Sequence, residues 1–165
     1  MDFKLILKSI LITISMPGVG IILLPYFILN ASGELNWPAI SIVNIIAFIF
    51  GLFSLFLLLQ CIWGFAAYGK GTLAPIDPPK HLVVRGFYKY TRNPMYLGVL
   101  GVLVSEAILF RSIDILIYLF IYGILFHLLV ILYEEPKLRA QFGESYKEYC
   151  QAVPRWWISF NQFRD

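Results

Sequence analysis

The chain has 165 residues, of which 59% are hydrophobic and only 14% are charged. A soluble domain usually carries about a quarter charged residues, so this composition excludes an ordinary water-soluble domain and indicates a protein of the lipid bilayer. The basic residues behind the net charge of +3 form no groove-reading motif, and Cys61 and Cys150 form neither a metal pattern nor a disulfide framework. Neither nucleic acid nor a metal ion is therefore expected as a partner.

Four segments are apolar enough to cross a membrane as helices. A hydrocarbon core of ~30 Å needs about 20 mostly apolar residues in helical conformation. In chain order the predicted spans are residues 5–29, 39–68, 94–110 and 113–133, of which the first is interrupted by Pro17 and the third is short. The whole chain, residues 1–165, is therefore predicted to be one all-α domain, an integral membrane helical bundle of about four transmembrane helices.

The basic residues are distributed unevenly around these spans. All of the 13 lysine and arginine residues except Arg111 lie before the first span or in its first turn, between the second and third, or after the fourth. Because cytoplasmic segments carry the excess of basic residues in membrane proteins, we expect a multi-pass protein with both termini in the cytosol. Spans three and four then form an antiparallel hairpin, which brings Arg92 and Glu134 to the same cytosolic rim.

The loop before the third predicted span carries polar and aromatic residues that are candidates for ligand binding. Pro94 suits the first turn of a helix, where its missing N–H is not needed, and Asn93 then falls at the N-cap position. Gly86 allows a turn in which the backbone approaches a ligand closely, and tyrosines within residues 88–96 lie beside Arg92. The alternative is that these residues form an aromatic and basic belt at the membrane surface. The spacing of the residues, taken alone, favours this belt over a ligand-binding loop.

The segment after the fourth predicted span adds acidic residues at the same rim. Glu134 and Glu135 are predicted to follow the end of that span, where the partial negative charge of a helix C-terminus disfavours carboxylates unless they are paired or used. Residues 138–154 are predicted to form a short amphipathic helix along the rim, anchored at the headgroups by Trp156 and Trp157. The alternative role for the glutamates is a salt bridge to an arginine of the loop.

Two blocks of residues, taken together, resemble a known family. They are Gly86-x-Tyr88-x-x-Thr91-Arg92-Asn93-Pro94-x-Tyr96-x-Gly98 and Glu134-Glu135-x-x-Leu138-x-x-x-Phe142-Gly143-x-x-Tyr146-x-x-Tyr149-x-x-x-Val153-Pro154. In this order, with one hairpin between them, they resemble the isoprenylcysteine carboxyl methyltransferase and phospholipid methyltransferase family over about residues 80–155. The chain departs from the family pattern at Phe87, where proline is usual, and at Asn93, where histidine is commoner, so proton chemistry by that histidine is excluded here.

The resemblance implies that S-adenosylmethionine binds in a pocket formed by the cytosolic loop, the cytosolic end of the hairpin and the C-terminal segment, and leaves as S-adenosylhomocysteine. By this analogy His81, Tyr88 and Arg92 hold the methionine end, and Glu134 or Glu135 accepts hydrogen bonds from the ribose. The full set implied for cofactor binding is His81, Gly86, Tyr88, Arg92, Pro94, Tyr96, Gly98, Glu134 and Glu135, and the catalytic candidates are Arg92, Asn93 and Glu135. Methyl transfer is an in-line displacement without a metal, so positioning is the main task of the enzyme.

Two polar residues lie inside the predicted spans, where such residues are candidates for function. His127 precedes Glu134 by seven residues, so on an α-helix the two share nearly one face, ~10 Å apart. We interpret His127 as a further catalytic candidate that lines the acceptor cavity or takes a proton from an amine; the alternative is an interhelical hydrogen bond. Glu106 is expected to pair with Arg111. Small residues are expected to form a helix-packing face: Gly98, Gly101 and Ser105.

The resemblance thus predicts an S-adenosylmethionine-dependent methyltransferase that acts on a membrane lipid or lipophilic small molecule at the membrane–cytosol interface. One alternative is an NADPH-dependent reductase of the sterol-reductase type, against which the short chain and Glu134-Glu135-Pro136 argue. Another is a non-catalytic membrane scaffold, which would not need arginine, tyrosine, asparagine and glutamate concentrated at one rim. The sequence does not choose between oxygen, nitrogen and sulfur as the methyl acceptor.

Overall fold

The structure, a computed structural model, describes residues 17–36, 38–68, 82 and 84–159. Every regular element in this part of the chain is helical, which confirms the predicted all-α class. The elements are η1 (Val19–Leu23), α2 (Leu24–Ser32), α3 (Ile42–Tyr68), η2 (Gly86–Lys89), α4 (Pro94–Phe110), α5 (Ile113–Leu129), η3 (Val130–Glu134), α6 (Glu135–Phe142) and α7 (Glu144–Ala152). Here η1 and η3 are π-helical turns and η2 is a 3₁₀ turn.

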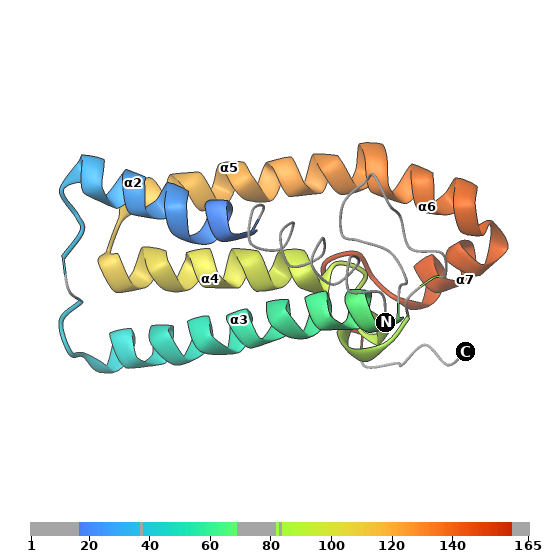
Figure 1. Cartoon of the computed structure of the whole chain (residues 1–165), viewed down its shortest axis with the longest axis horizontal. Coiled ribbons are helices and arrows are strands. Elements are labelled where there is room, and N and C mark those ends of the chain that lie inside the picture. Colours follow the sequence, from blue (N-terminus) through green and yellow to red (C-terminus); the bar gives the residue numbers. More distant parts are fainter. Residues whose placement is uncertain (1–16, 37, 69–81, 83, 160–165) are drawn as a thin grey trace.

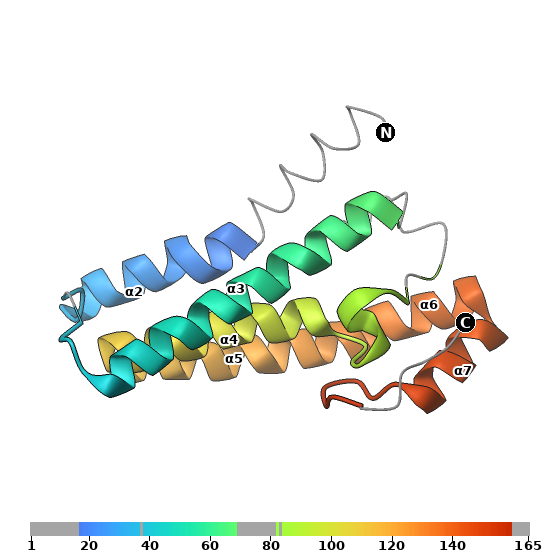
Figure 2. The same cartoon turned by 90° about the horizontal axis from the view of Figure 1, so that it is seen from below.

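Four helices form an elongated bundle. Helix α4 packs against α3 on one side and α5 on the other, and α2 lies along α5 (Figures 1 and 2). The region Ile42–Gly64 and the helix that begins at Ile113 are long and apolar enough to cross a membrane, whereas Val19–Ser32 and Pro94–Phe110 are shorter apolar helices. The part of the first predicted span before residue 17 lies outside the described residues, so the four-span topology remains a prediction.

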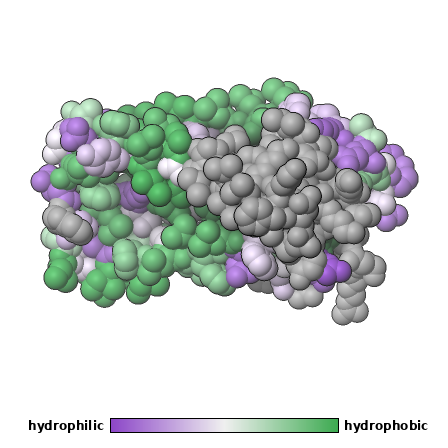
Figure 3. Space-filling view, in the orientation of Figure 1, coloured by the Kyte–Doolittle hydropathy of each residue, from purple (hydrophilic) through white to green (hydrophobic). Residues whose placement is uncertain are grey.

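The outer surface of the bundle is apolar. Figure 3 shows hydrophobic residues over the middle of the molecule and hydrophilic residues gathered toward its two ends. Large side chains are exposed on both long helices, among them Ile46 and Phe53 on α3 and Phe120 on α5. A soluble monomer rarely exposes a continuous apolar surface of this extent, so this face of the bundle suits lipid.

Small residues allow α3 and α4 to approach closely. A methyl group added at Gly98 would lie 3.0 Å from the backbone nitrogen of Leu58 and from the backbone oxygen of Ser54. One added at Gly101 would overlap the Ser54 hydroxyl, and the Ser105 hydroxyl donates a hydrogen bond of 2.7 Å to the backbone of α3. The predicted packing face is confirmed, because any larger side chain on it would force the two helices apart.

Each π-helical turn lies just before a proline, at Pro25 and at Pro136. A proline inside a helix lacks an N–H, and its ring clashes with the carbonyl four residues earlier. The wider turn relieves that clash, since the N–H of Glu135 bonds to the oxygen of Val130 five residues back. The helix therefore continues from α5 into α6. Our prediction that Glu134 and Glu135 follow the end of a membrane helix is wrong, and the helix-end charge invoked for them is absent.

The long helix ends at Gly143, and α7 then folds back against α6. Gly143 has φ +55°, a conformation that glycine adopts at little cost. The predicted single amphipathic helix over residues 138–154 is therefore two helices. A cluster of buried side chains joins α7 and the residue after it to the segment that precedes α4: Val84, Tyr146, Tyr149 and Val153. Leu138 and Phe142 of α6 are partly buried against this cluster. This cluster fixes the end of the bundle that carries the predicted site.

Candidate functional site

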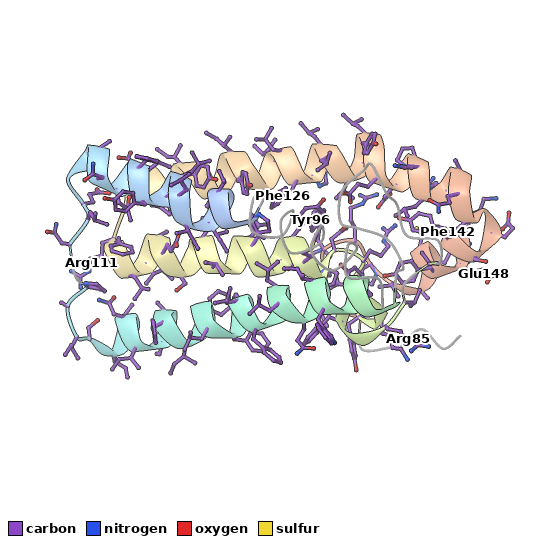
Figure 4. All side chains as sticks on the ribbon, in the orientation of Figure 1. Arg85, Tyr96, Arg111, Phe126, Phe142 and Glu148 are labelled. Carbon is purple, nitrogen blue, oxygen red and sulfur yellow. The ribbon has the colours of Figure 1, made fainter. Side chains whose placement is uncertain are left out.

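The candidate site lies where the start of α4, the η3–α6 region and the C-terminal segment meet. In Figure 4, Tyr96 and Phe126 lie together between α4 and α5, while Arg111 lies at the opposite end of the bundle. Residues 154–159, which we call the C-terminal strap, pass across the start of α4. The backbone N–H of Arg92 donates to the Pro154 carbonyl at 3.0 Å, and that of Ser159 donates to the Tyr90 carbonyl at 2.8 Å.

Asn93 helps to hold this strap. It stands at the N-cap of α4 as predicted, but its side chain makes no capping hydrogen bond. Its Nδ2 instead donates to the carbonyl of Arg155 at 3.1 Å, and the Thr91 hydroxyl donates to the same carbonyl at 3.2 Å. Asn93 is buried, so its amide serves to fix the backbone of the strap.

Glu135 is the charged centre of the site. Arg155 donates to both of its carboxylate oxygens, from Nε at 2.6 Å and from Nη2 at 2.9 Å. Arg92 Nη1 lies 3.1 Å from Oε1, and Arg139 Nη2 lies 3.8 Å from Oε2. Burial by itself would raise the pKa of Glu135, but the Arg155 hydrogen bonds and the charges of Arg92, Arg155 and Arg139 outweigh it and lower that pKa. Glu135 is therefore held as an ion paired with three arginines.

Glu134, its neighbour, has very different surroundings. Within the described part of the chain it has one hydrogen bond, from the neutral hydroxyl of Tyr96 to Oε1. Burial raises the pKa of Glu134, and the adjacent charge of Glu135 raises it further, against the opposing effect of the Tyr96 hydrogen bond. The two adjacent carboxylates thus differ: the charge of Glu135 is neutralised by arginines, and that of Glu134 is not.

Arg92 has one bonded and one unbonded side. Its Nη1 contacts Glu135 and also lies 2.7 Å from the sulfur of Cys150. Its Nε is buried and meets no hydrogen-bond acceptor among the described residues. A buried donor without an acceptor is costly, so this N–H is the least satisfied polar group of the Arg92 side chain among the described residues.

His127 and Trp156 form a second polar contact. The indole N–H of Trp156 donates to Nδ1 of His127 at 3.0 Å, and the ring centroids are 6.0 Å apart. Trp156 also lies 6.4 Å from the ring of Tyr96, which in turn lies 4.4 Å from Phe126. His127 is thus connected to Glu134 through two intervening side chains, Trp156 and Tyr96.

The remaining predicted residues differ in what the structure says of them. Gly86 has φ +57°, so the predicted turn is present. Burial raises the pKa of Tyr88 well above its usual range. Pro94 is buried in the first turn of α4, Gly98 packs against α3, and His81 lies outside the described residues.

Glu106 does not pair with Arg111 as we expected. One of its carboxylate oxygens, Oε2, is buried without a hydrogen-bond partner in the described part of the chain. Arg111 takes the left-handed conformation that ends α4, with φ +52°, and its side chain is exposed. The reversal of the backbone at Arg111 leaves the two side chains in different environments.

The sequence interpretation missed the role of Arg155. In the sequence it is only one of the basic residues of the predicted cytosolic side, yet it links the strap to Glu135 by its side chain and to Thr91 and Asn93 by its carbonyl. The available signal was its place directly after Val153-Pro154, at the end of the second block. Cys150, whose sulfur meets Arg92, was likewise treated only as an unpaired thiol.

An apolar helical bundle that carries clustered arginines and glutamates at one end is consistent with a membrane enzyme that binds a polar ligand at the membrane surface. The family model described as phospholipid methyltransferase matches residues 40–145, a range that spans α3 to the start of α7. The chain therefore belongs to the phospholipid methyltransferase family. Comparisons with curated proteins and with solved structures gave no match.

Membership in this family makes the chain a methyltransferase of the membrane-associated class. It bears out the resemblance found in the two sequence blocks, and it favours the methyltransferase prediction over the reductase and scaffold alternatives. Family members generally use S-adenosylmethionine and act on lipids.

Proposed function

We propose that the chain transfers the methyl group of S-adenosylmethionine to a lipid or lipophilic acceptor at the membrane–cytosol interface, with both termini in the cytosol. The observation that carries this proposal is the contrast between the two glutamates. Glu135 is neutralised by arginines, whereas Glu134 has only the neutral phenol of Tyr96 as a hydrogen-bond partner among the described residues. Glu134 is thus the carboxylate that is available to a ligand with hydroxyl groups.

The residues at the rim fit the two polar ends of S-adenosylmethionine. The Nε–H of Arg92, which has no acceptor among the described residues, suits the carboxylate of the methionine end, since a guanidinium binds a carboxylate well. Glu134 suits the ribose hydroxyls, and Tyr96 donates a hydrogen bond to it. Aromatic faces also stabilise a sulfonium as they stabilise other cations. Of the two carboxylates first considered for the ribose, we therefore assign Glu134.

Glu135 then has a positioning role. Its carboxylate oxygen Oε1 contacts both Arg92 and Arg155, and Oε2 also accepts from Arg155, so that the guanidinium of Arg92 keeps a fixed orientation. Asn93 adds to this by holding the backbone of the strap. Neither residue needs to contact the reacting atoms, and we propose that both act through Arg92 and Arg155.

Methyl transfer requires mainly that the methyl donor and the acceptor be aligned with each other. S-adenosylmethionine supplies an electrophilic methyl group on a positively charged sulfur. The chain orients the two reactants and excludes water, which is how positioned groups accelerate a bimolecular displacement. No side chain has to act as a covalent nucleophile. The position of Arg92 at the start of α4 and of Glu134 next to the apolar helix α5 lets a lipophilic acceptor approach from the membrane side.

Ligand stabilisation tests the proposal. At a hundred times its Kd, S-adenosylhomocysteine would stabilise the protein by about 2.7 kcal/mol, or roughly 5–10 °C in Tm for a chain of this size. We expect this shift for the purified protein in detergent and no shift with NADPH. A Tm that rises with NADPH and not with S-adenosylhomocysteine would contradict the proposal.

Two matched variants test the residue assignment. We expect Glu134→Gln to lose the shift given by S-adenosylhomocysteine. Glu148→Gln is the control, because Glu148 is an exposed glutamate on α7, and it should keep the full shift. Equal shifts in the two variants would contradict the assignment of Glu134 while leaving the family activity standing. Transfer of a radiolabelled methyl group into a membrane lipid extract, with the product identified by mass, would then identify the acceptor.

A further inference from the structure

A polar pair lies on the lipid-facing side of the candidate site. His127 is exposed on α5, within the predicted fourth span, and Trp156 reaches it from the C-terminal strap. The two residues are 29 positions apart in sequence, and their contact depends on the strap passing beside α5. An ionisable residue on a membrane helix is usually paired or functional.

The hydrogen bond between them fixes the tautomer of His127. An indole N–H can only donate, so the nitrogen that accepts it, Nδ1, must carry a lone pair. A neutral imidazole has one proton, and this proton must therefore be on Nε2. In this arrangement Nε2 cannot take a proton from an amine, so His127 acts as a hydrogen-bond donor and not as the base first considered for it.

The donor on Nε2 has no acceptor among the residues that the structure describes. Among the residues that the structure describes, His127 has one hydrogen bond, and that bond uses Nδ1. An N–H that faces apolar surroundings without an acceptor costs on the order of 1–3 kcal/mol. An oxygen from a bound lipid is the partner that this exposed face of α5 can receive.

The pair also adjoins the cofactor side of the site. The Trp156 ring lies 6.4 Å from that of Tyr96, and the Tyr96 hydroxyl donates to Glu134. Tyr96 is in turn 4.4 Å from Phe126 on α5. A headgroup held at His127 is therefore next to the aromatic residues that separate the membrane side from Glu134.

We propose that His127 Nε2–H binds an anionic oxygen in the headgroup of the methyl acceptor, and that Trp156 is the positioning residue that fixes its ring. The inference rests on the proposed function and deepens it. The recognised chemistry is a phosphodiester or a carboxylate, which occur in phospholipids and in prenylated cysteines respectively. Because His127 lies next to the site, its Nε2–H would favour methyl acceptors that carry an anionic oxygen near the atom to be methylated.

Steady-state kinetics in mixed micelles distinguish this role from a structural one. The two acceptors to be offered are phosphatidylethanolamine and N-acetyl-S-farnesylcysteine, so that the wild-type chain reports which oxygen source it uses. His127→Phe should raise the KM for that acceptor at least tenfold and leave the KM for S-adenosylmethionine within twofold. Trp156→Phe, which keeps an aromatic ring and removes the N–H, should raise the acceptor KM severalfold.

The control is Trp157→Phe, since Trp157 is the neighbouring residue and is 82% exposed. It should change neither KM. An unchanged acceptor KM in His127→Phe would overturn the inference, and so would an equal rise in both KM values, because that result indicates a general structural role.

A lipid-binding measurement separates this inference from the proposed function. Native mass spectrometry of the detergent-released protein should show phosphatidylethanolamine, or the farnesylcysteine, retained by the wild type and by Trp157→Phe and lost from His127→Phe. If S-adenosylhomocysteine gives no stabilisation and no acceptor is methylated, the proposed function fails, and this measurement still decides the headgroup site. Equal retention by His127→Phe and Trp157→Phe would refute the headgroup site even where methyl transfer is observed.

Discussion

Replacement of Glu135 by glutamine is expected to destabilise the end of the bundle that carries the candidate site. The side chain of Arg92 is only 11% exposed and would lose its ionic partner, and removing one member of a buried pair costs roughly 3–5 kcal/mol. Arg155, which is 29% exposed, keeps one hydrogen bond at most, to the amide oxygen, because the amide NH2 cannot accept from a guanidinium. Arg139, at 59%, contributes little because solvent screens it. A loss of about 3 kcal/mol corresponds to roughly 6–12 °C in Tm for a chain of this length.

Thermal melts of detergent-purified protein at neutral pH measure this loss, with Glu134→Gln as the matched variant. Glu134 faces a neutral phenol, and glutamine retains an oxygen that can accept the Tyr96 hydrogen bond. We therefore expect the Tm of Glu134→Gln to remain within about 3 °C of the wild type, in line with the ordinary effect of a single neutral hydrogen bond. The division of roles between the two carboxylates would be refuted if Glu135→Gln melted within 2 °C of the wild type. It would also be refuted if Glu134→Gln had a lower Tm than Glu135→Gln.

Three further outcomes follow from the same structure. The arginines lower the pKa of Glu135 against the opposing effect of burial, so its stabilising contribution is present above the unfolded pKa of about 4.3 and is lost as the pH falls through the folded pKa. In thermal melts the Tm difference between wild type and Glu135→Gln should therefore shrink as the pH falls below about 4, and a constant difference would contradict this. Gly98→Ala should lower the free energy of unfolding by about 1–3 kcal/mol, because the new methyl would lie 3.0 Å from the backbone of α3. Gly123→Ala, whose methyl would meet only a leucine side-chain carbon at 3.8 Å, should raise it by about 0.5–1 kcal/mol, and denaturant or thermal unfolding compares the two. Arg155→Lys should lose the two-point bond to its glutamate and increase cleavage of the strap in limited proteolysis, whereas Lys147→Ala, which removes an exposed ion pair, should leave cleavage unchanged.

The helices of the bundle could be predicted because their limits are marked by local chemistry. The predicted third span, 94–110, has the bounds of α4, since Pro94 begins the helix and the left-handed Arg111 ends it. The continuation of the fourth helix past Glu134 could not be predicted in the same way. Proline is usually a stop signal for a helix, and the π-helical turn that lets the chain continue through Pro136 leaves no mark in hydropathy or length.

The site could be predicted only as far as the hairpin allowed. An antiparallel pair of helices brings Arg92 and the two glutamates to one end, and the Arg92–Glu135 ion pair is the salt bridge that was considered from the sequence. Whether Arg92 pairs with Glu134 or with Glu135 depends on the direction in which each glutamate side chain leaves the helix near the π-helical turn. The contribution of Arg155 depended on a reversal of the chain at Gly143 and on the return of the strap to α4, and these are tertiary features without a local pattern.

The strap connects the two halves of the proposed reaction. Arg155 and Trp156 are adjacent in sequence, yet Arg155 binds Glu135 beside the proposed cofactor and Trp156 binds His127 on the membrane side. The backbone between them is fixed by Thr91 and Asn93 at the start of α4. A displacement of the strap would therefore release Glu135 and His127 together. On this arrangement the orientation of the cofactor-binding arginine and the donor for the acceptor headgroup depend on one short segment, so the two binding events are expected to be thermodynamically coupled through it.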